Sequence, residues 1–262
     1  MGKAVRLSVS LMLAVLMMAF ICFLDTTQVS GADNGAAVIK KGTVTEQEIV
    51  KNLQSKSVRY LEKMGYTKAQ IKTIKNCDLK SLTGKVTYWV SYQDFRSVKV
   101  KARNSGKKYW VTKVKTVAKW KWINQPICAF MDIYGVTTSD KFVKDSAKGT
   151  ITYHQMGDRR LEKKTVTAKI STNNTGRGVY TKFPVGLGYK PNAGFKWKCT
   201  NGILTTNWVA DGKINVVGLA SNYGHSVLEL SPSVSFSAGA SISFHPYIST
   251  KYGDEAFVRA RK

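Results

Sequence analysis

The chain has 262 residues, and its 41 lysines and arginines against 16 aspartates and glutamates give a formal net charge of +25. A charge of magnitude about 2–8 already keeps a small domain soluble, so this excess favours a partner that carries phosphates or carboxylates over a merely lysine-rich proteome. The length suits a single domain with a small appendage and is enough to bury a sizeable core.

The first 32 residues have the order of a secretory signal peptide. Lys3 and Arg6 precede an apolar run over 7–24, and the small residues Ser30, Gly31 and Ala32 follow it. A charged start, an apolar stretch and a small-residue cleavage site define such signals. We therefore expect residues 1–32 to be removed and the protein to be secreted and associated with a cell surface. An uncleaved membrane anchor is the alternative, because roughly 20 apolar residues span a bilayer.

Residues 33–44 are predicted to be a flexible leader, and residues 45–76 a helical hairpin. Thr45 with Glu48, and Thr67 with Gln70, have the spacing of capping boxes that begin two helices. Gly65 stands where a helix C-terminal glycine belongs. The hairpin is too short to hold a core alone, so we expect it to pack on the rest of the protein or on a partner.

Residues 85–262 are predicted to form an antiparallel β domain. Valine, threonine, tyrosine, tryptophan and serine dominate, and turn residues recur at short intervals. Hairpin turns are expected at Asn104-Ser105-Gly106, Gly157-Asp158, Asn201-Gly202 and Asp211-Gly212. Long loops are expected at 123–148 and 173–192. The predicted fold class is mainly β, an antiparallel β-sandwich or barrel with a small N-terminal helical hairpin.

Alternating lysines in 97–122 suggest a site for an anionic ligand. Side chains alternate across a strand, so basic residues at odd positions would share one face and the tryptophans 110, 120 and 122 the opposite, core-facing one. The predicted binding residues are Lys99, Lys101, Arg103, Lys113, Lys115, Lys119 and Lys121. The alternative is a solvated sheet face whose lysines protect an edge strand from aggregation.

The segment from Ser233 to Phe244 alternates serine or glycine with apolar residues without a change of phase. Such alternation is typical of a strand of a membrane pore, where one face meets lipid and the other meets water. It is equally typical of an ordinary half-buried strand, which is the interpretation we favour because a second arm with the same pattern is not apparent.

Residues with catalytic potential are sparse. Cys199 with His225 is a conceivable nucleophile–base pair, and Asp132, Asp140 and Asp145 lie in one predicted loop. No metal, nucleotide or hydrolase motif is present, so we expect no catalytic residue, no metal site and no cofactor. After removal of the signal three cysteines remain, Cys77, Cys128 and Cys199, and the sequence leaves open whether any two form a disulfide.

Three groups of residues resemble exported, β-rich proteins of low-GC Gram-positive bacteria that have no assigned function. They are the segment from Tyr60 to Ile71, the pattern Trp120-x-Trp122-x-x-x-Pro126 with Asp132 after it, and Tyr223-Gly224-His225. The resemblance implies an exported protein of such a bacterium and supplies no catalytic residues.

The sequence therefore predicts a non-catalytic, strongly basic protein that binds anionic polymers or surfaces of the cell envelope. Teichoic acid-like polymers, anionic lipid headgroups and extracellular DNA are compatible partners; protein partners are not indicated. A secreted membrane-active protein, pore-forming or bacteriocin-like, is the first alternative, and a cell-envelope hydrolase the second.

Overall fold

The computed structural model describes residues 41–139, 141–157, 162–191, 194–228, 233–237, 241–245 and 256–261. The chain divides into two units, Met1–Asn34 and Gly35–Lys262, and all described residues belong to the second. The expected signal peptide, residues 1–32, and the first part of the expected leader lie outside the described residues. Within these residues no helix is both long enough and apolar enough to cross a membrane.

The N-terminal part of the second unit contains one strand and three α-helices. Residues 41–44, expected in the leader, belong instead to β1 (Lys41–Thr45), because their backbone pairs with that of β2 (Lys85–Lys101). The helices are α2 (Glu46–Ser55), α3 (Val58–Lys63) and α4 (Lys68–Asn76), followed by the 3-10 turn η1 (Leu79–Ser81).

Side-chain caps fix where these helices begin and end. The Thr45 hydroxyl accepts from the Glu48 N–H, and Thr67 and Gln70 form a reciprocal capping box. A third cap, at Ser57, starts α3 and divides the first helical stretch in two. Gly65 ends α3 with a φ of 93°, a conformation that favours glycine.

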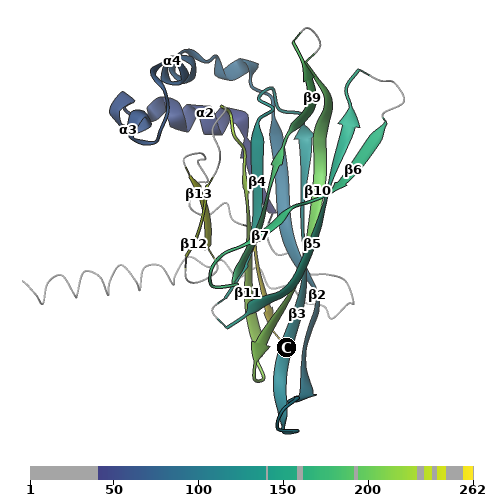
Figure 1. The fold of residues 1–262 in the computed structure, drawn as a ribbon. Helices are drawn as coiled ribbons and strands as arrows, with labels where there is room; N and C mark the ends of the chain where they lie inside the picture. The colour runs from purple at the N-terminus through teal and green to yellow at the C-terminus, as the bar shows by residue number, and fades with distance from the viewer. Residues whose placement is uncertain are drawn as a thin grey trace, which may run out of the picture. The chain divides into compact units, whose positions relative to one another are not determined.

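Two antiparallel sheets form the body of the unit (Figure 1). Sheet A has seven strands in the order β1-β2-β3-β10-β5-β6, with β9 also paired to β10. Its strands besides β1 and β2 are β3 (Lys108–Asn124), β5 (Val143–Gln155), β6 (Lys163–Thr167), β9 (Gly186–Lys190) and β10 (Gly194–Asp211). Sheet B has five strands in the order β14 (Ala256–Arg261), β11 (Val216–Gly224), β4 (Met131–Thr138), β8 (Gly178–Pro184) and β7 (Ile170–Thr172). A separate pair consists of β12 (Ser233–Ser237) and β13 (Ser241–His245).

Aromatic side chains from both sheets fill the core between them. The ring of Trp120 on β3 lies 5.0 Å from that of Phe183 on β8 and 4.8 Å from that of Tyr134 on β4. The ring of Tyr223 on β11 lies within 6.2 Å of all three. Aromatic groups in such tilted and edge-on contacts contribute about 0.5–1.5 kcal/mol per pair beyond their area burial. The predicted fold class is confirmed: the protein is mainly β, with antiparallel sheets in a sandwich-like arrangement.

The two long loops expected at 123–148 and 173–192 are largely strands, which corrects the prediction. The first contains β4 and the start of β5, and the second contains β8 and β9. Seven of the eight residues of β4 are buried, so both faces of this strand are covered. A strand covered on both faces lacks the polar–apolar alternation by which strands are recognised in sequence.

The turn expected at Asn201-Gly202 is also wrong, because β10 runs through both residues. Gly202 lies opposite Trp120 in the ladder with β3. A Cβ at this position would lie 1.9 Å from Cζ2 of Trp120, so the glycine makes room for the indole ring. The expected turns at Gly106 and Gly212 are present, with φ values of 64° and 84°.

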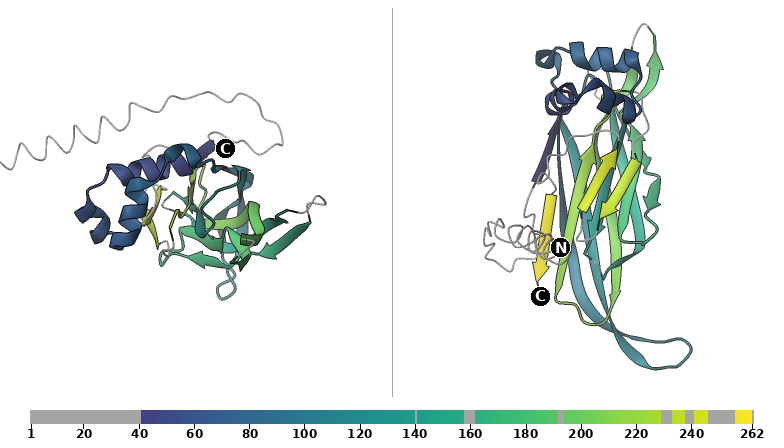
Figure 2. Two further views of the ribbon diagram at one scale, coloured as in Figure 1. Left: turned by 90° about the horizontal axis from the view of Figure 1, so that it is seen from above. Right: turned by 90° about the vertical axis from the view of Figure 1, so that its left-hand side faces the viewer.

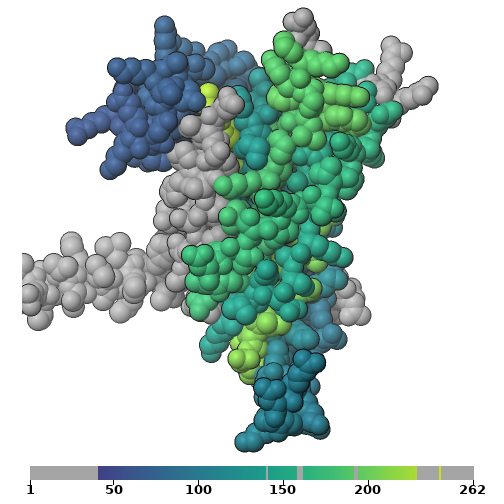
Figure 3. All heavy atoms as spheres, viewed as in Figure 1, coloured from purple at the N-terminus to yellow at the C-terminus, as the bar shows by residue number. Residues whose placement is uncertain are grey.

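The helices and the β2–β3 turn occupy opposite ends of the long strands (Figure 1). The helices cover one end of the sheets, and in the space-filling view the β2–β3 hairpin projects beyond the other strands at the far end (Figure 3). The two ends therefore offer different surroundings to the charged side chains placed there.

Candidate functional site

Four of the predicted binding residues lie on the outer face of sheet A, away from the aromatic core. They are Lys113, Lys115, Lys119 and Lys121 of β3. Their alternate neighbours Val114, Trp120 and Trp122 are buried, so the lysines occupy the outer face by strand alternation. Within the described part of the chain none of these four lysines forms an ion pair.

Residues on the neighbouring strands extend this surface. Lys119 faces Trp89 on β2 and Ile203 on β10, and Lys121 faces Thr87 and Asn201. Further out, Lys41 of β1 pairs with Trp89 and Lys148 of β5 pairs with Thr205 of β10. We call this surface the basic face; its cationic members are Lys41, Lys113, Lys115, Lys119, Lys121 and Lys148.

Lys99, Lys101 and Arg103 do not join the basic face, which corrects the prediction of a one-sided lysine ladder. Lys99 lies opposite Trp110 and Lys101 opposite Lys108, on the opposite side of the ribbon from Lys113. Arg103 lies in the exposed turn. Next to the turn 102–107, odd-numbered residues of β2 pair with even-numbered residues of β3. A register shift between Tyr92 and Asp94 changes this pairing, so odd-numbered residues face odd-numbered ones only on the helix side of the shift.

The expectation that all three tryptophans of β3 are core residues is confirmed for two of them. Trp120 and Trp122 are buried, whereas Trp110 is half-exposed near the β2–β3 turn. Two lysine ammonium groups lie over its ring, Lys213 at 4.1 Å and Lys99 at 5.4 Å from the centroid. On the basic face Lys41 lies 5.7 Å from the ring of Trp89. Cations over an aromatic face are attracted by its quadrupole.

A second group of charges, which sequence reasoning missed, is fully buried where the helices meet the sheets. Glu46 is the first residue of α2, Asp132 lies on β4, and His225 directly follows β11. His225 donates through Nδ1 to Asp132 Oδ1 at 2.8 Å and through Nε2 to Glu46 Oε1 at 3.3 Å. All three side chains are 0% exposed. We call these three residues the buried triad.

Backbone and side-chain donors satisfy both carboxylates of the triad. Glu46 accepts hydrogen bonds from the N–H groups of Gly84 (2.9 Å), Ile127 (3.2 Å) and Cys128 (2.8 Å). Asp132 accepts from the Tyr223 hydroxyl and from the Ser226 N–H. The triad thus joins α2, the segment after β3, β4 and the end of β11 into one hydrogen-bonded unit.

Electrostatics make His225 a cation between two carboxylates. Burial alone would lower the pKa of His225, but the charge of Asp132 and the hydrogen bonds to Asp132 and Glu46 raise it to about 9. Burial alone would raise the pKa of Glu46, but the hydrogen bonds from His225 and Cys128 and the His225 charge lower it to about 2. At neutral pH the triad therefore contains a protonated His225 beside an ionised Glu46.

The triad differs from the nucleophile–base pair considered from the sequence. His225 bonds Asp132, not Cys199, and both of its ring nitrogens are occupied. Cys199 is buried, and burial raises the pKa of its thiol far above the ordinary value. His225 has no exposed surface and bonds a carboxylate through each ring nitrogen, so its ring is held in place.

Of the other candidate acids, only Asp145 is described, and it is not part of the triad. Asp145 lies exposed on β5, and Asp140 is outside the described residues. Among the residues that the structure describes, no group of three or more histidine, cysteine, aspartate or glutamate side chains has the geometry of a metal site.

Two of the three residue groups that resemble exported β-rich proteins contain members of the triad. Asp132, Tyr223 and His225 belong to those motifs, and so do Trp120 and Trp122. The ring of Trp122 lies 5.0 Å from that of His225 in an edge-on contact. Two of the three motifs therefore meet at one buried cluster, whereas the third, from Tyr60 to Ile71, lies in α3 and α4.

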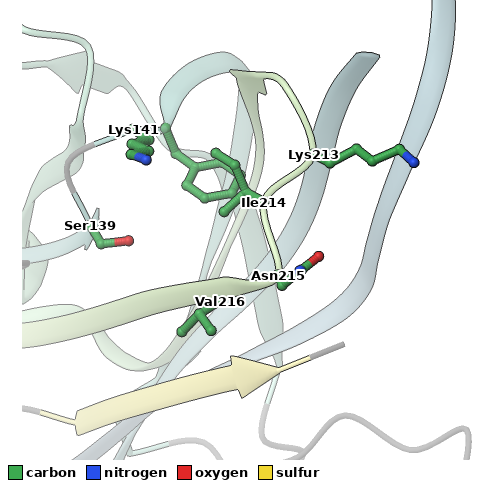
Figure 4. A pocket seen from close by; sticks show the side chains of 7 residues that line it. Ser139, Lys141, Lys213, Ile214, Asn215 and Val216 are labelled. Atoms are coloured by element: carbon green, nitrogen blue, oxygen red, sulfur yellow. The ribbon is translucent and has the colours of Figure 1, made fainter.

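A hollow of about 450 Å³ lies between the segment after β4 and the β10–β11 connection (Figure 4). It is lined by Ser139, Lys141, Phe142, Lys213, Ile214, Asn215 and Val216. The ammonium of Lys213 points away from it toward Trp110. No histidine, cysteine or carboxylate is among the lining residues.

The segment 233–244, expected to be one strand, is instead the hairpin of β12 and β13. Ser233 pairs with His245, Phe236 with Ile242 and Ser237 with Ser241. Positions 234, 236, 242 and 244, which are all apolar, share one face of the hairpin, and the serine positions share the other. The second arm that the sequence did not reveal is thus the second half of the same segment.

Comparisons with known proteins add little. No family model matches the chain, and no curated protein is significantly similar to it. Among solved structures it is similar to the KRT10-binding region domain of the pneumococcal serine rich repeat protein PsrP (10% identity, 54% of this chain and 88% of that one, TM-score 0.21).

Two further structures match as weakly. One is the collagen binding domain of Erysipelothrix rhusiopathiae surface protein RspB (12% identity, 68% and 66% covered, TM-score 0.26), and the other is Clostridium perfringens delta-toxin (7%, 86% and 87%, TM-score 0.18). These scores are too low to carry an argument about function.

Proposed function

We propose that the protein is a non-catalytic binding protein that attaches to anionic polymers or surfaces of the cell envelope through its basic face. The observation that carries the proposal is the row of four lysines on the outer face of β3. Lys113, Lys115 and Lys121 are exposed and Lys119 is half-buried, and none of the four forms an ion pair within the described residues. Opposite them on β10 stand uncharged residues, Asn201, Ile203, Asn207 and Val209. Unpaired cations spaced along one strand attract a phosphate or carboxylate polymer without needing fixed ligand geometry.

Flanking residues support the same use of this surface. Trp89 is half-exposed beside Lys119, and threonines at 87, 150 and 152 provide hydroxyl groups on the same face. Asp94, opposite Lys115, is already paired with Arg96 at 3.2 Å. Because Asp94 is paired with Arg96, it does little to compensate the positive charge of the β3 lysines.

The test is binding to long-chain polyphosphate at a series of salt concentrations. Replacing Lys113, Lys115, Lys119 and Lys121 by glutamine removes charge and keeps most of each side chain. We expect weaker binding and a shallower slope of log affinity against log salt, because fewer counterions are released. The matched control replaces four exposed helix lysines, Lys51, Lys63, Lys68 and Lys72, and removes the same charge elsewhere. Equal losses in the two variants would show that net charge, not the basic face, governs binding.

A membrane-active role is the second candidate, favoured by the β12–β13 hairpin. Both arms of this hairpin alternate serine with apolar residues, as the strands of a membrane pore do. An anionic lipid headgroup carries the same phosphate chemistry as an envelope polymer, so the basic face serves either role.

A further inference from the structure

The half of the basic face nearest the helices mixes cations with apolar side chains. Two rows of residues cross sheet A there, with one residue from each of β1, β2, β3, β10, β5 and β6. The first row is Lys41, Trp89, Lys119, Ile203, Thr150 and Thr167, and the second is Thr43, Thr87, Lys121, Asn201, Thr152 and Thr165. None of these residues is acidic, so the rows combine lysines and hydroxyl groups with two large apolar side chains.

The two apolar side chains of the first row stand on either side of Lys119. Ile203 is 38% exposed, and Trp89 is half-exposed, with the ammonium of Lys41 at 5.7 Å from the ring centroid. Lys119 itself is half-buried between them. A lysine in such surroundings can lay its methylene groups along its apolar neighbours and keep its charge in water.

A third apolar side chain extends the same surface toward the helices. Ile123 follows Lys121 by two residues on β3 and is 55% exposed, whereas Trp122 between them is buried. Because side chains alternate across a strand, Ile123 points outward with Lys121. The basic face therefore ends in an exposed isoleucine at the helix side.

This half of sheet A is open to solvent. The helices and the β12–β13 hairpin pack elsewhere: α2 contacts β1 and α4, and β13 contacts β11 and β4 of sheet B. In the right-hand view of Figure 2 the hairpin lies in front of the long strands, on the side of β11. The exposure of Ile123 and Ile203 shows that the outer side of sheet A remains accessible.

The apolar side chains distinguish between two kinds of anionic ligand. A dissolved phosphate polymer and a layer of lipid headgroups both offer phosphates to lysines. Only the lipid layer has an apolar boundary directly beneath its phosphates. Binding at that boundary grows with apolar area as well as with electrostatic attraction, and tryptophan is favoured there. A surface that carries both kinds of group on one flat sheet face suits a bilayer better than a polymer.

We propose that this half of the basic face lies flat on a bilayer with anionic phosphate headgroups. The lysines of the two rows contact the phosphates, and Trp89, Ile123 and Ile203 reach the boundary between headgroups and hydrocarbon chains. The inference rests on the proposed function, because it names the anionic surface that the basic face binds. No strand has to move, since these side chains already point outward.

The experiment compares binding to vesicles with binding to polyphosphate. Vesicles of equal parts phosphatidylcholine and phosphatidylglycerol, and long-chain polyphosphate, are each titrated with the protein without the expected signal peptide, whose apolar run would itself bind lipid. Ile123→Thr combined with Ile203→Thr removes apolar area and keeps a β-branched side chain at both positions. We expect about tenfold weaker binding to vesicles and less than about a twofold change for polyphosphate, because only the bilayer has an apolar layer.

The matched control removes exposed apolar area outside the basic face. It combines Val58→Thr on α3 with Val216→Thr at the start of β11, since these valines are 51% and 37% exposed, close to the values of the two isoleucines. The control should change binding to either ligand by less than about twofold. Lys119→Gln with Lys121→Gln should weaken binding to both ligands, because both carry phosphates.

The other outcomes overturn the inference. Unchanged vesicle binding by the isoleucine variant, an equal loss on both ligands or an equal loss in the control overturns it and leaves the proposed function standing. Binding to polyphosphate but not to vesicles does the same, whereas binding to neither contradicts the proposed function as well. Ile203→Trp serves where the double variant unfolds at a lower urea concentration: it should strengthen vesicle binding about threefold, and unchanged binding overturns the inference.

Discussion

The helix end of the two sheets and the β2–β3 end use charge in opposite ways. At the helix end Glu46, Asp132 and His225 are fully buried, and each charge meets hydrogen-bonding partners. At the β2–β3 end Lys99, Lys101 and Arg103 are exposed, and the ammonium group of Lys99 lies over the ring of Trp110. A buried ion whose partner is removed is costly, whereas an exposed one is screened by water and salt. The helix end should therefore govern stability, while exposed lysines remain free for ligands.

The largest expected effect is that of Glu46→Ala at the helix end. The change leaves the N–H groups of Gly84, Ile127 and Cys128 without their acceptor and His225 with one carboxylate in place of two. Loss of one partner of a buried ion pair costs about 3–5 kcal/mol. Urea unfolding measures this, with Glu48→Ala as the control, because Glu48 is exposed and its loss should cost about 1 kcal/mol or less. Similar costs for both variants would mean that the triad contributes little to stability.

The next effect is a dependence of stability on pH that the triad imposes. The folded pKa of His225, about 9, is above its ordinary 6.5, so its contribution is fully present below about pH 6.5 and is lost as the pH rises to about 9. The folded pKa of Glu46, about 2, is below its ordinary 4.5, so its contribution is present above about pH 4.5 and is lost as the pH falls to about 2. Stability should therefore be greatest between about pH 4.5 and 6.5.

Urea midpoints between pH 3 and 10 test this dependence. The loss between pH 6.5 and 9 should amount to about 3 kcal/mol, at about 1.4 kcal/mol for each pKa unit. His225→Gln should remove this alkaline loss while lowering stability at pH 6. A parent protein whose stability rises between pH 6.5 and 9 would show that His225 is neutral in the folded state.

Sequence patterns predicted the helices and strands that have one buried and one exposed face, and missed the strand that is buried on both faces. Thr67 and Gln70, and the alternation in β3, have local causes, so the α4 cap and the long strand were predictable. β4 is covered on both faces and therefore resembled a loop. The prediction that the basic residues share one face was correct among the lysines of β3 and wrong for those of β2. The register shift near Gln93 separates the two groups, and its position depends on long-range pairing that the β2 sequence does not reveal.

The buried triad shows the same limit more strongly. Glu46 follows a helix cap, where acidic residues are common at the surface, and nothing local marks it as buried. Its partner His225 is 179 residues away in the chain. Only the fold brings a first-turn glutamate, a strand aspartate and a histidine after a strand into contact, so sequence analysis found Asp132 and His225 separately and did not join them.

The smallest expected effect is at the exposed end and sharpens the contrast with Glu46→Ala. Lys213 lies 4.1 Å from the centroid of the Trp110 ring, the shortest of the cation–ring distances in the described residues. Lys213→Gln should cost about 0.5–1 kcal/mol in urea unfolding, the usual value for such a contact at an exposed site. Lys107→Gln is the matched control, since Lys107 is exposed in the β2–β3 turn and lies over no ring among the described residues; it should be neutral. A cost above about 3 kcal/mol for Lys213→Gln would mean that this end of the sheet, too, depends on its charges for stability, and the division between the two ends would not hold.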